Sequence, residues 1–146
     1  MSSQSVRVIE STAYGKIEVN DSHIFHFPKG IFGFDGLHDY VMMQVGDGPF
    51  HVLHALDEQI SFILLPASLA ADDYGFHIGQ SVIDMLEIAR PEDVMTFVIV
   101  NVIDNQIYVN LKAPIIINTI NRKAAQHIID DASYPLRHPL SIREGS

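Results

Sequence analysis

Cysteine is missing from all 146 residues of this chain. Its absence excludes disulfides, zinc sites built on thiolates and cysteine nucleophiles, and it is most natural in a reducing cytosol. Long apolar runs are missing too: the longest, Phe97 to Ile103, is interrupted by Asn101 and falls far short of the roughly 20 residues that cross a bilayer. The first residues, Met1 to Ser5, lack the charged start and apolar stretch of a secretion signal. We therefore expect a cytoplasmic protein that does not enter a membrane.

Basic residues are absent between Lys29 and Arg90, although the whole chain carries nine of them against 18 acids and a net charge of −9. An acidic segment disfavours nucleic acid, which proteins bind by neutralising phosphates with Lys and Arg. It would instead attract a basic protein surface. The alternative is a solvated acidic face that only keeps the protein soluble. The acids of this segment are Asp35, Asp39, Asp47, Asp57, Glu58, Asp72, Asp73, Asp84 and Glu87.

Catalytic motifs are also lacking. The chain has no G-x-S-x-G nucleophile elbow. The glycines of 30–33 stand among aromatic side chains and are followed by Asp35, whose charge would repel a phosphate. Adjacent carboxylates such as Asp57-Glu58 fall in predicted turns and are most simply solvated, although acid–base chemistry at such pairs stays open as an alternative. We predict no enzymatic activity and no cofactor.

Eight histidines raise the question of a metal site. His23 and His26 are three residues apart, as are His51 and His54. An odd spacing in a strand sends two side chains to opposite faces, so neither pair can chelate one ion if its strand is regular. We predict no metal site.

Short apolar segments separated by turn residues predict an all-β fold: a small antiparallel β-barrel-like domain with one short helix. Ser81 to Asp84 has the pattern of a capping box, and Pro91 would end that helix. Residues 1–146 are expected to form a single domain with its core at about 14–140. The predicted strands are 15–19, 23–27, 40–45, 50–56, 61–65, 95–103, 106–112, 115–119 and 124–129, followed by an extended tail at 134–140.

Two local features refine the later strands. Asp104-Asn105 can supply the two positive-φ residues of a tight hairpin. Pro114 has no N–H to donate, so it should interrupt the ladder and belongs at an edge, a bulge or a strand start. Between these features, Asn110 is expected on the outward face of its strand, where its amide can bond a partner's backbone.

Two strings in order along the chain carry a family resemblance: Phe27-Pro28-Lys29-Gly30-Ile31-Phe32-Gly33-Phe34-Asp35, and Asn110-Leu111-Lys112-Ala113-Pro114-Ile115-Ile116-Ile117-Asn118. With the ending Tyr134-Pro135-Leu136-Arg137, they resemble the FliW family of bacterial flagellar assembly factors over roughly residues 14–140. The chain departs from the family pattern at His54-Ala55, where Gln-Ser is expected, and at Phe32. If the strand that contains His54-Ala55 lies at a partner surface, the affinity of this chain for that partner would differ from that of other family members.

The resemblance implies a non-enzymatic protein that acts as a chaperone and in translation regulation. Its free oligomeric state stays open, with a monomer favoured. FliW-like proteins bind flagellin before export and bind the translational regulator CsrA, which relieves repression of flagellin messenger RNA. Met42, Phe34 or Tyr40, if exposed, would offer flagellin an apolar surface, although Met and aromatic residues at these spacings are more often in the core. The alternative is a small barrel that carries an apolar ligand. The residues expected to contact partners are Phe34, Asp35, Asp39, Asp57, Asp72, Asp73, Asn110, Asn118 and Gln126.

Overall fold

The computed structural model describes residues 6–71, 74–130 and 134–140, and most of its regular structure is β-strand. The all-β prediction is confirmed. The strands are β1 (Val6–Ser11), β2 (Gly15–Asn20), β3 (Ile24–His26), β4 (Asp39–Gln44), β5 (His51–Ala55), β6 (Ser61–Pro66), β7 (Val94–Ile103), β8 (Gln106–Asn118), β9 (Ala124–Gln126) and β10 (His138–Pro139). Between them lie the α-helices α1 (Ala67–Ala70) and α2 (Gln80–Leu86) and the 3₁₀ helices η1 (Asp21–His23) and η2 (Pro91–Asp93).

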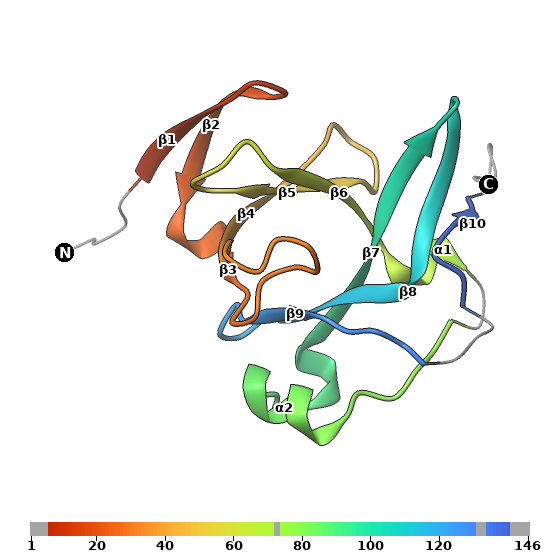
Figure 1. Cartoon of the computed structure of the whole chain (residues 1–146). Coiled ribbons are helices and arrows are strands. Elements are labelled where there is room, and N and C mark those ends of the chain that lie inside the picture. The colour runs from red at the N-terminus through yellow and green to blue at the C-terminus, as the bar shows by residue number, and fades with distance from the viewer. Residues whose placement is uncertain (1–5, 72–73, 131–133, 141–146) are drawn as a thin grey trace.

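Strands β3 to β8 follow one another as antiparallel neighbours, and β9 pairs with the second half of β8. The sheet curls until the segment just before β9 meets β3, where the His26 N–H donates to the Arg122 carbonyl at 2.9 Å. Figure 1 shows the resulting nearly closed ring of strands. The predicted barrel-like arrangement is confirmed.

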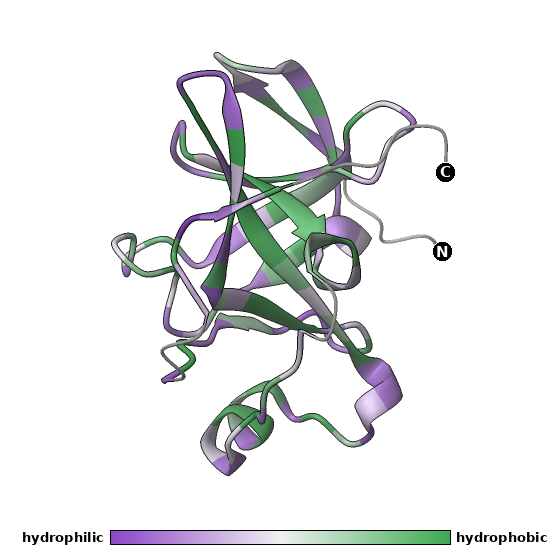
Figure 2. Cartoon of the chain, turned by 90° about the vertical axis from the view of Figure 1, so that its right-hand side faces the viewer, coloured by the Kyte–Doolittle hydropathy of each residue, from purple (hydrophilic) through white to green (hydrophobic). Residues whose placement is uncertain are grey.

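The inside of the ring is filled by apolar side chains from every wall. Leu53, Leu64, Ile115 and Tyr40 are each fully buried there. Figure 2 shows hydrophobic residues concentrated along the strands in the middle of the molecule. Of the two places considered for Tyr40, a surface for flagellin and the core, the structure has the core, because its ring faces inward against Phe27 at 5.2 Å between ring centroids. A hollow of about 260 Å³ opens into this interior beside Phe25, Met42, Phe97 and Ile117.

The glycine-containing corner 27–37 covers one mouth of the barrel (Figure 1). Ile31 lies in the core and is 1% exposed. Gly30 has a φ of 71°, and a β-carbon there would lie 2.8 Å from the Phe34 carbonyl oxygen. Only glycine permits both this backbone angle and this close approach. The corner is therefore mainly architectural.

Strands β1 and β2 form a separate two-stranded ribbon that lies outside the barrel (Figure 1). Ile17 and Val19 of β2 are buried against Val41 of β4, and Ile9 of β1 packs at the edge of the same cluster. The strand at 15–19 was predicted, whereas β1 was not. The ribbon adds a second layer over the outer face of β4.

Strand β8 continues through Pro114, because the ladder accommodates it in a bulge. Phe97 pairs with Ile115 and Ile99 pairs with Asn110, so four residues of β8 lie opposite one of β7. The prediction that Pro114 lies at a bulge is confirmed, whereas the two strands expected at 106–112 and 115–119 form the single strand β8. At the far end of this hairpin Asp104 and Asn105 have φ angles of 51° and 67°, as predicted.

The capping-box prediction is wrong. Helix α2 begins at Gln80 with Gly79 as its N-cap, so Ser81 lies inside the first turn and makes no capping bond. The helix ends at Leu86 rather than near Pro91, because Glu87 adopts a left-handed conformation with a φ of 56°. With seven residues α2 is the longest helix, and none in the described ranges is long and apolar enough to cross a membrane.

The tail is extended, as predicted, and it runs beside the first half of β8. His138 and Pro139 pair with Val109 and Tyr108, and the Leu111 N–H donates to the Pro135 carbonyl at 3.1 Å. The Tyr74 hydroxyl donates to the Leu111 carbonyl at 2.5 Å. Burial raises the pKa of Tyr74, and the neighbouring Tyr134 raises it further.

Candidate functional site

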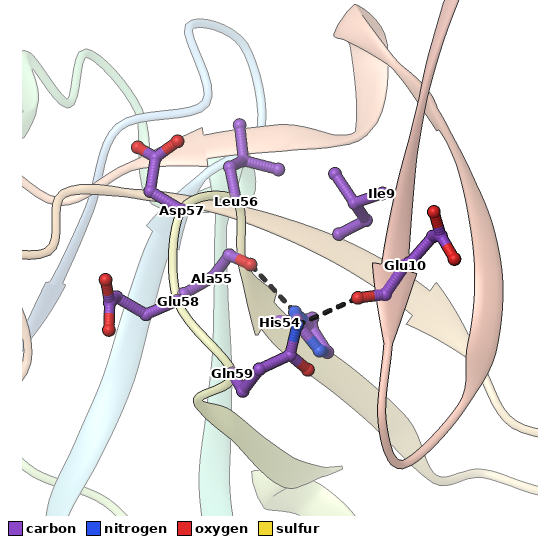
Figure 3. A pocket seen from close by; sticks show the side chains of 8 residues that line it. All are labelled: Ile9, Glu10, His54, Ala55, Leu56, Asp57, Glu58 and Gln59. Atoms are coloured by element: carbon purple, nitrogen blue, oxygen red, sulfur yellow. Dashed lines mark hydrogen bonds between the residues drawn. The ribbon is translucent and has the colours of Figure 1, made fainter.

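A groove with a volume of about 430 Å³ lies between β1 and the turn that follows β5. Its walls come from segments far apart in sequence: Ile9 and Glu10 on one side, and residues 54–59 on the other. Figure 3 shows these side chains around the opening. The groove therefore exists only because the ribbon lies against the barrel.

His54 fixes one end of the contact between the ribbon and the barrel. It is 2% exposed, with Nδ1 2.7 Å from the Ala55 carbonyl and Nε2 3.0 Å from the Ser11 hydroxyl. Since a carbonyl only accepts, Nδ1 carries the proton and Nε2 accepts from Ser11. The same Ser11 oxygen accepts from the N–H groups of Ala13 and Tyr14 at 3.2 and 3.0 Å. His54, where the chain departs from the family pattern, thus has a structural role: it joins the ribbon to the barrel.

Gln59 makes the second contact. Its Nε2 donates to the Glu10 carbonyl at 2.8 Å, and its Oε1 accepts from the Thr12 N–H at 2.9 Å. The side-chain amide therefore bonds to the backbone of β1 and of its turn on the side away from β2 (Figure 3). Because β1 was not predicted, neither was this contact. The Val-Arg-Val-Ile-Glu run before a Gly-containing turn is the signal that would have found it.

Three exposed acidic residues line the groove, although the side chain of Glu10 points to the opposite face of β1 from Ile9 and only its backbone is turned toward the opening. Figure 3 shows Glu10 on one side and Asp57 and Glu58 on the other, with Ile9 and Leu56 between them. No Lys or Arg is among the residues that line it. Such a site has an apolar floor and an anionic rim, so it suits a cationic partner that also presents an apolar side chain.

The predicted acidic residues are only partly brought together. Asp57 is in the groove, and Asp39 is next to it, because the Leu56 N–H donates to the Asp39 carbonyl at 3.2 Å. The Asp39 carboxylate also lies 2.7 Å from His26 Nδ1. Asp35 is exposed on the corner 27–37. Asp72 and Asp73 lie outside the described residues.

The other acidic residues between Lys29 and Arg90 are dispersed over the described structure, and they do not form one face. Asp47 lies in the turn after β4, at the opposite end of that strand from Asp39, and Asp84 lies on α2. Glu87 pairs with Lys123. The groove instead recruits Glu10, which precedes the segment in sequence.

The three predicted amides bond within the chain. Asn118 is 2% exposed and donates to the Leu86 carbonyl at 2.8 Å, so it caps the end of α2. Asn110 Oδ1 accepts from the Lys112 and Ala113 N–H groups at 3.0 and 3.1 Å, which stabilises the bulge. Gln126 accepts from the Phe32 N–H at 2.8 Å and donates to the Ala113 carbonyl at 3.2 Å. Gln126 thus uses both ends of its amide within the chain, and Asn110 uses its Oδ1, which leaves Asn110 Nδ2 as the one group of these two amides without a bond in the described residues.

Apolar surface is found elsewhere than expected. Phe34 is half-buried with its ring 5.6 Å from that of Phe62, and Met42 packs against the barrel core. A second groove of about 260 Å³ lies on the outside of the barrel below the tip of the ribbon. Its lining is Tyr14, Val45, Phe50, Val52, Ile63, Val100, Val102 and Ile107. Val102 is 61% exposed there.

Metal-binding groups of three or more His, Cys, Asp or Glu side chains do not occur within 6–71, 74–130 and 134–140. His26 and His38 stack on one another at 5.9 Å between centroids, and His51 lies against Phe97. These imidazoles contact other rings and backbone groups.

A family model, related sequences and a solved structure all indicate the same protein family. Residues 8–140 match the model of the FliW protein family. The chain is 37% identical to flagellar assembly factor FliW of Caldicellulosiruptor saccharolyticus over 136 residues, which covers 91% of this chain and 90% of that protein. It is 30% identical to the same factor of Treponema denticola over 135 residues, covering 90% and 92%. A crystal structure of the flagellar assembly factor FliW superposes with a TM-score of 0.86 at 28% identity, covering 94% of this chain and 99% of the other.

Proposed function

Because the chain belongs to the FliW family of flagellar assembly factors, we propose that it is a cytoplasmic, non-enzymatic protein that binds flagellin and binds and antagonises CsrA. In this role flagellin synthesis is coupled to export, because free flagellin competes for the protein and releases CsrA. The observation that carries the proposal is the groove between β1 and the turn after β5, with its anionic rim and apolar floor.

The charge of the groove supports CsrA as one partner. An RNA-binding regulator carries basic surface, since RNA is held by Lys and Arg contacts to phosphate. Glu10, Asp57 and Glu58 would face that surface, with Asp39 and Asp35 extending the negative potential along the barrel mouth. Association driven by such charges is fast at low salt and slows steeply as ionic strength rises.

The apolar groove outside the barrel supports flagellin as the other partner. Amphipathic helices dock by laying an apolar face into a hydrophobic groove. Tyr14, Val45 and Val102 are 38%, 44% and 61% exposed around it. We propose this surface for flagellin in place of the one considered from sequence at Met42, Phe34 and Tyr40.

The first test measures the CsrA association rate for a double variant, Asp57→Asn with Glu58→Gln. We expect at least a tenfold slower rate at low ionic strength and a shallower dependence on salt. Asp47→Asn with Asp104→Asn changes net charge equally at exposed turns away from the groove, and it should leave the rate within about twofold. Equal effects of the two double variants would rule out the groove as the CsrA surface.

The second test is a competition. Flagellin is added to a preformed complex with CsrA, and RNA binding by the released CsrA is measured. Release of CsrA supports the exchange, whereas a stable ternary complex argues against it. Absence of both binary complexes at micromolar concentration and low salt would overturn the proposed function.

A further inference from the structure

We propose that the groove holds an extended basic segment of a partner protein, which adds to the open edge of β1 as a further strand. The inference rests on the proposed function only in using the same groove as a binding surface. In the described part of the chain β1 pairs with β2 alone, so its other edge carries no strand. Arg7, Val8 and Glu10 are all exposed along it.

The contact made by Gln59 shows which backbone groups point outward. Its amide donates to the Glu10 carbonyl and accepts from the Thr12 N–H, on the side away from β2. A residue of a parallel strand placed opposite Ser11 would make the same two bonds. Gln59 thus already occupies one position of a ladder along this edge.

The period of two in a strand extends that ladder toward the amino terminus. If the Glu10 carbonyl points outward, so do the Glu10 N–H and both backbone groups of Val8. Ile9 and Ser11 use theirs toward β2, in register with Ile17 and Gly15. The Val8 and Glu10 groups are therefore directed to the side where an added strand would lie.

The side chains around this edge define the chemistry of the occupant. Ile9 faces the barrel beside Leu56, so alternate residues of an added strand would point an apolar side chain into the groove. The residues between them would lie beside Val8 and Glu10 on the outer face, where a basic side chain meets a carboxylate. Lys16 lies across from Glu10 on β2, on the side away from the open edge.

Charge also argues against a second copy of this chain as the occupant. Pairing two β1 edges would bring Glu10, Asp57 and Glu58 of one molecule close to the same groups of another, and each chain has a net charge of −9. Like charges placed opposite one another destabilise a strand pair. A basic partner has the opposite effect.

The test uses a labelled synthetic peptide of four Lys-Val repeats, without flagellin or CsrA, so this inference and the proposed function can fail separately. We expect binding that weakens as salt is added, and slower hydrogen exchange of the Val8 and Glu10 amides on binding. A peptide of four Glu-Val repeats should bind at least tenfold more weakly. Equal binding of the acidic peptide, or protection confined to other residues, would overturn the proposal.

Two N-methylated peptides test the strand pairing without altering the protein. One carries N-methyl groups on every Lys and the other on every Val. Only one of these sets can face β1, because alternate residues of a strand bond to opposite sides. We expect one peptide to bind at least tenfold more weakly and the other to bind like the parent; equal binding by both would show that no ladder forms.

A protein variant gives a further check. Val8→Pro removes the outward N–H without removing a bond to β2, whereas Val8→Thr keeps that N–H and the branched side chain. The proline variant should bind the Lys-Val peptide at least tenfold more weakly than the threonine variant. If the proline variant does not fold, the N-methylated peptides decide. Sedimentation of the protein alone tests a second copy as the occupant. A concentration-dependent dimer that is lost in Val8→Pro and retained in Val8→Thr would overturn the proposal, because the β1 edge would then bind another copy of this chain.

Discussion

At the scale of single residues, Tyr40 is a buried side chain whose hydroxyl bonds to no described residue. Its ring is fully buried between Phe27 and Phe62. A buried hydroxyl without a partner costs free energy, and phenylalanine keeps the ring contacts. We expect Tyr40→Phe to raise the free energy of unfolding by about 1 kcal/mol, measured by urea denaturation.

Tyr74→Phe is the matched control for this change, because it deletes a hydroxyl that does have a partner, the Leu111 carbonyl. It should lower the free energy of unfolding by about 1 kcal/mol. A loss of stability in Tyr40→Phe of similar size would mean that a buried water bonds the Tyr40 hydroxyl.

Gly30 and Gly33 separate two reasons for glycine within one corner. Both have positive φ angles, of 71° and 90°, but a β-carbon would meet backbone atoms within 3 Å only at Gly30. Gly33→Ala should therefore cost about 1 kcal/mol from backbone strain, and Gly30→Ala about 3 kcal/mol because the clash is added. Thermal denaturation of both variants measures the difference, and equal costs would contradict the close approach at Gly30.

At the scale of elements, the ribbon β1–β2 is held to the barrel partly by one amide. Gln59→Ala removes the bonds to the Glu10 carbonyl and the Thr12 N–H. We expect a loss of about 1–2 kcal/mol in the free energy of unfolding and faster hydrogen exchange of the Thr12 amide. The neighbouring variant Glu58→Ala changes the same turn without removing these bonds. An equal effect of both variants on Thr12 exchange would show that Gln59 does not hold the ribbon.

Most of the strands were predictable from sequence because turn residues interrupt apolar segments of strand length. Asp104-Asn105 and Pro114 were placed correctly, since their backbone chemistry is local. The helix start was missed because α2 begins at Gln80 after Gly79, an N-cap residue without a side chain, so the Ser81 pattern had no capping role. Strand β1 was missed although the Val-Arg-Val-Ile-Glu run is a local strand signal, whereas its packing beside Leu56 and Val41 depends on the tertiary fold.

The candidate site was harder to predict than the fold. Asp57 was identified from charge alone, but Glu10 and Gln59 join it only through the packing of the ribbon. Asn110 and Gln126 look like outward-facing strand amides in the sequence, and Asn118 was expected at a bulge or turn as well as among the partner contacts. Each is instead used to satisfy backbone groups at a bulge, a helix end or a corner. Such uses depend on which backbone groups the tertiary fold leaves unpaired.

At the scale of the whole molecule, stability should fall at alkaline pH. Burial raises the pKa of both Tyr40 and Tyr74 in the folded protein, and at Tyr74 the nearby Tyr134 adds to the shift. The unfolded chain releases these protons near pH 10, so above that pH it binds fewer protons than the folded chain. The free energy of unfolding must then decrease as pH rises.

Urea denaturation between pH 9 and about 11 checks this prediction against the ordinary tyrosine pKa. We expect a shallower decline in Tyr74→Phe and in Tyr40→Phe, and the shallowest in the double variant. A slope unchanged in all three variants would contradict the assignment of the pH dependence to these hydroxyls.

The meeting of β3 with the segment before β9 has a consequence for biosynthesis. The bond from the His26 N–H to the Arg122 carbonyl joins parts of the chain between which strands β4 to β8 all lie. A chain emerging from the ribosome cannot make that bond until residue 122 has been added. Until then its apolar strands have no sealed interior, and nascent chains with exposed strand edges are prone to associate with one another. The time at risk is thus set by the translation of strands β4 to β8 and the turn after them, because the last seam of the barrel cannot form before residue 122 has been made.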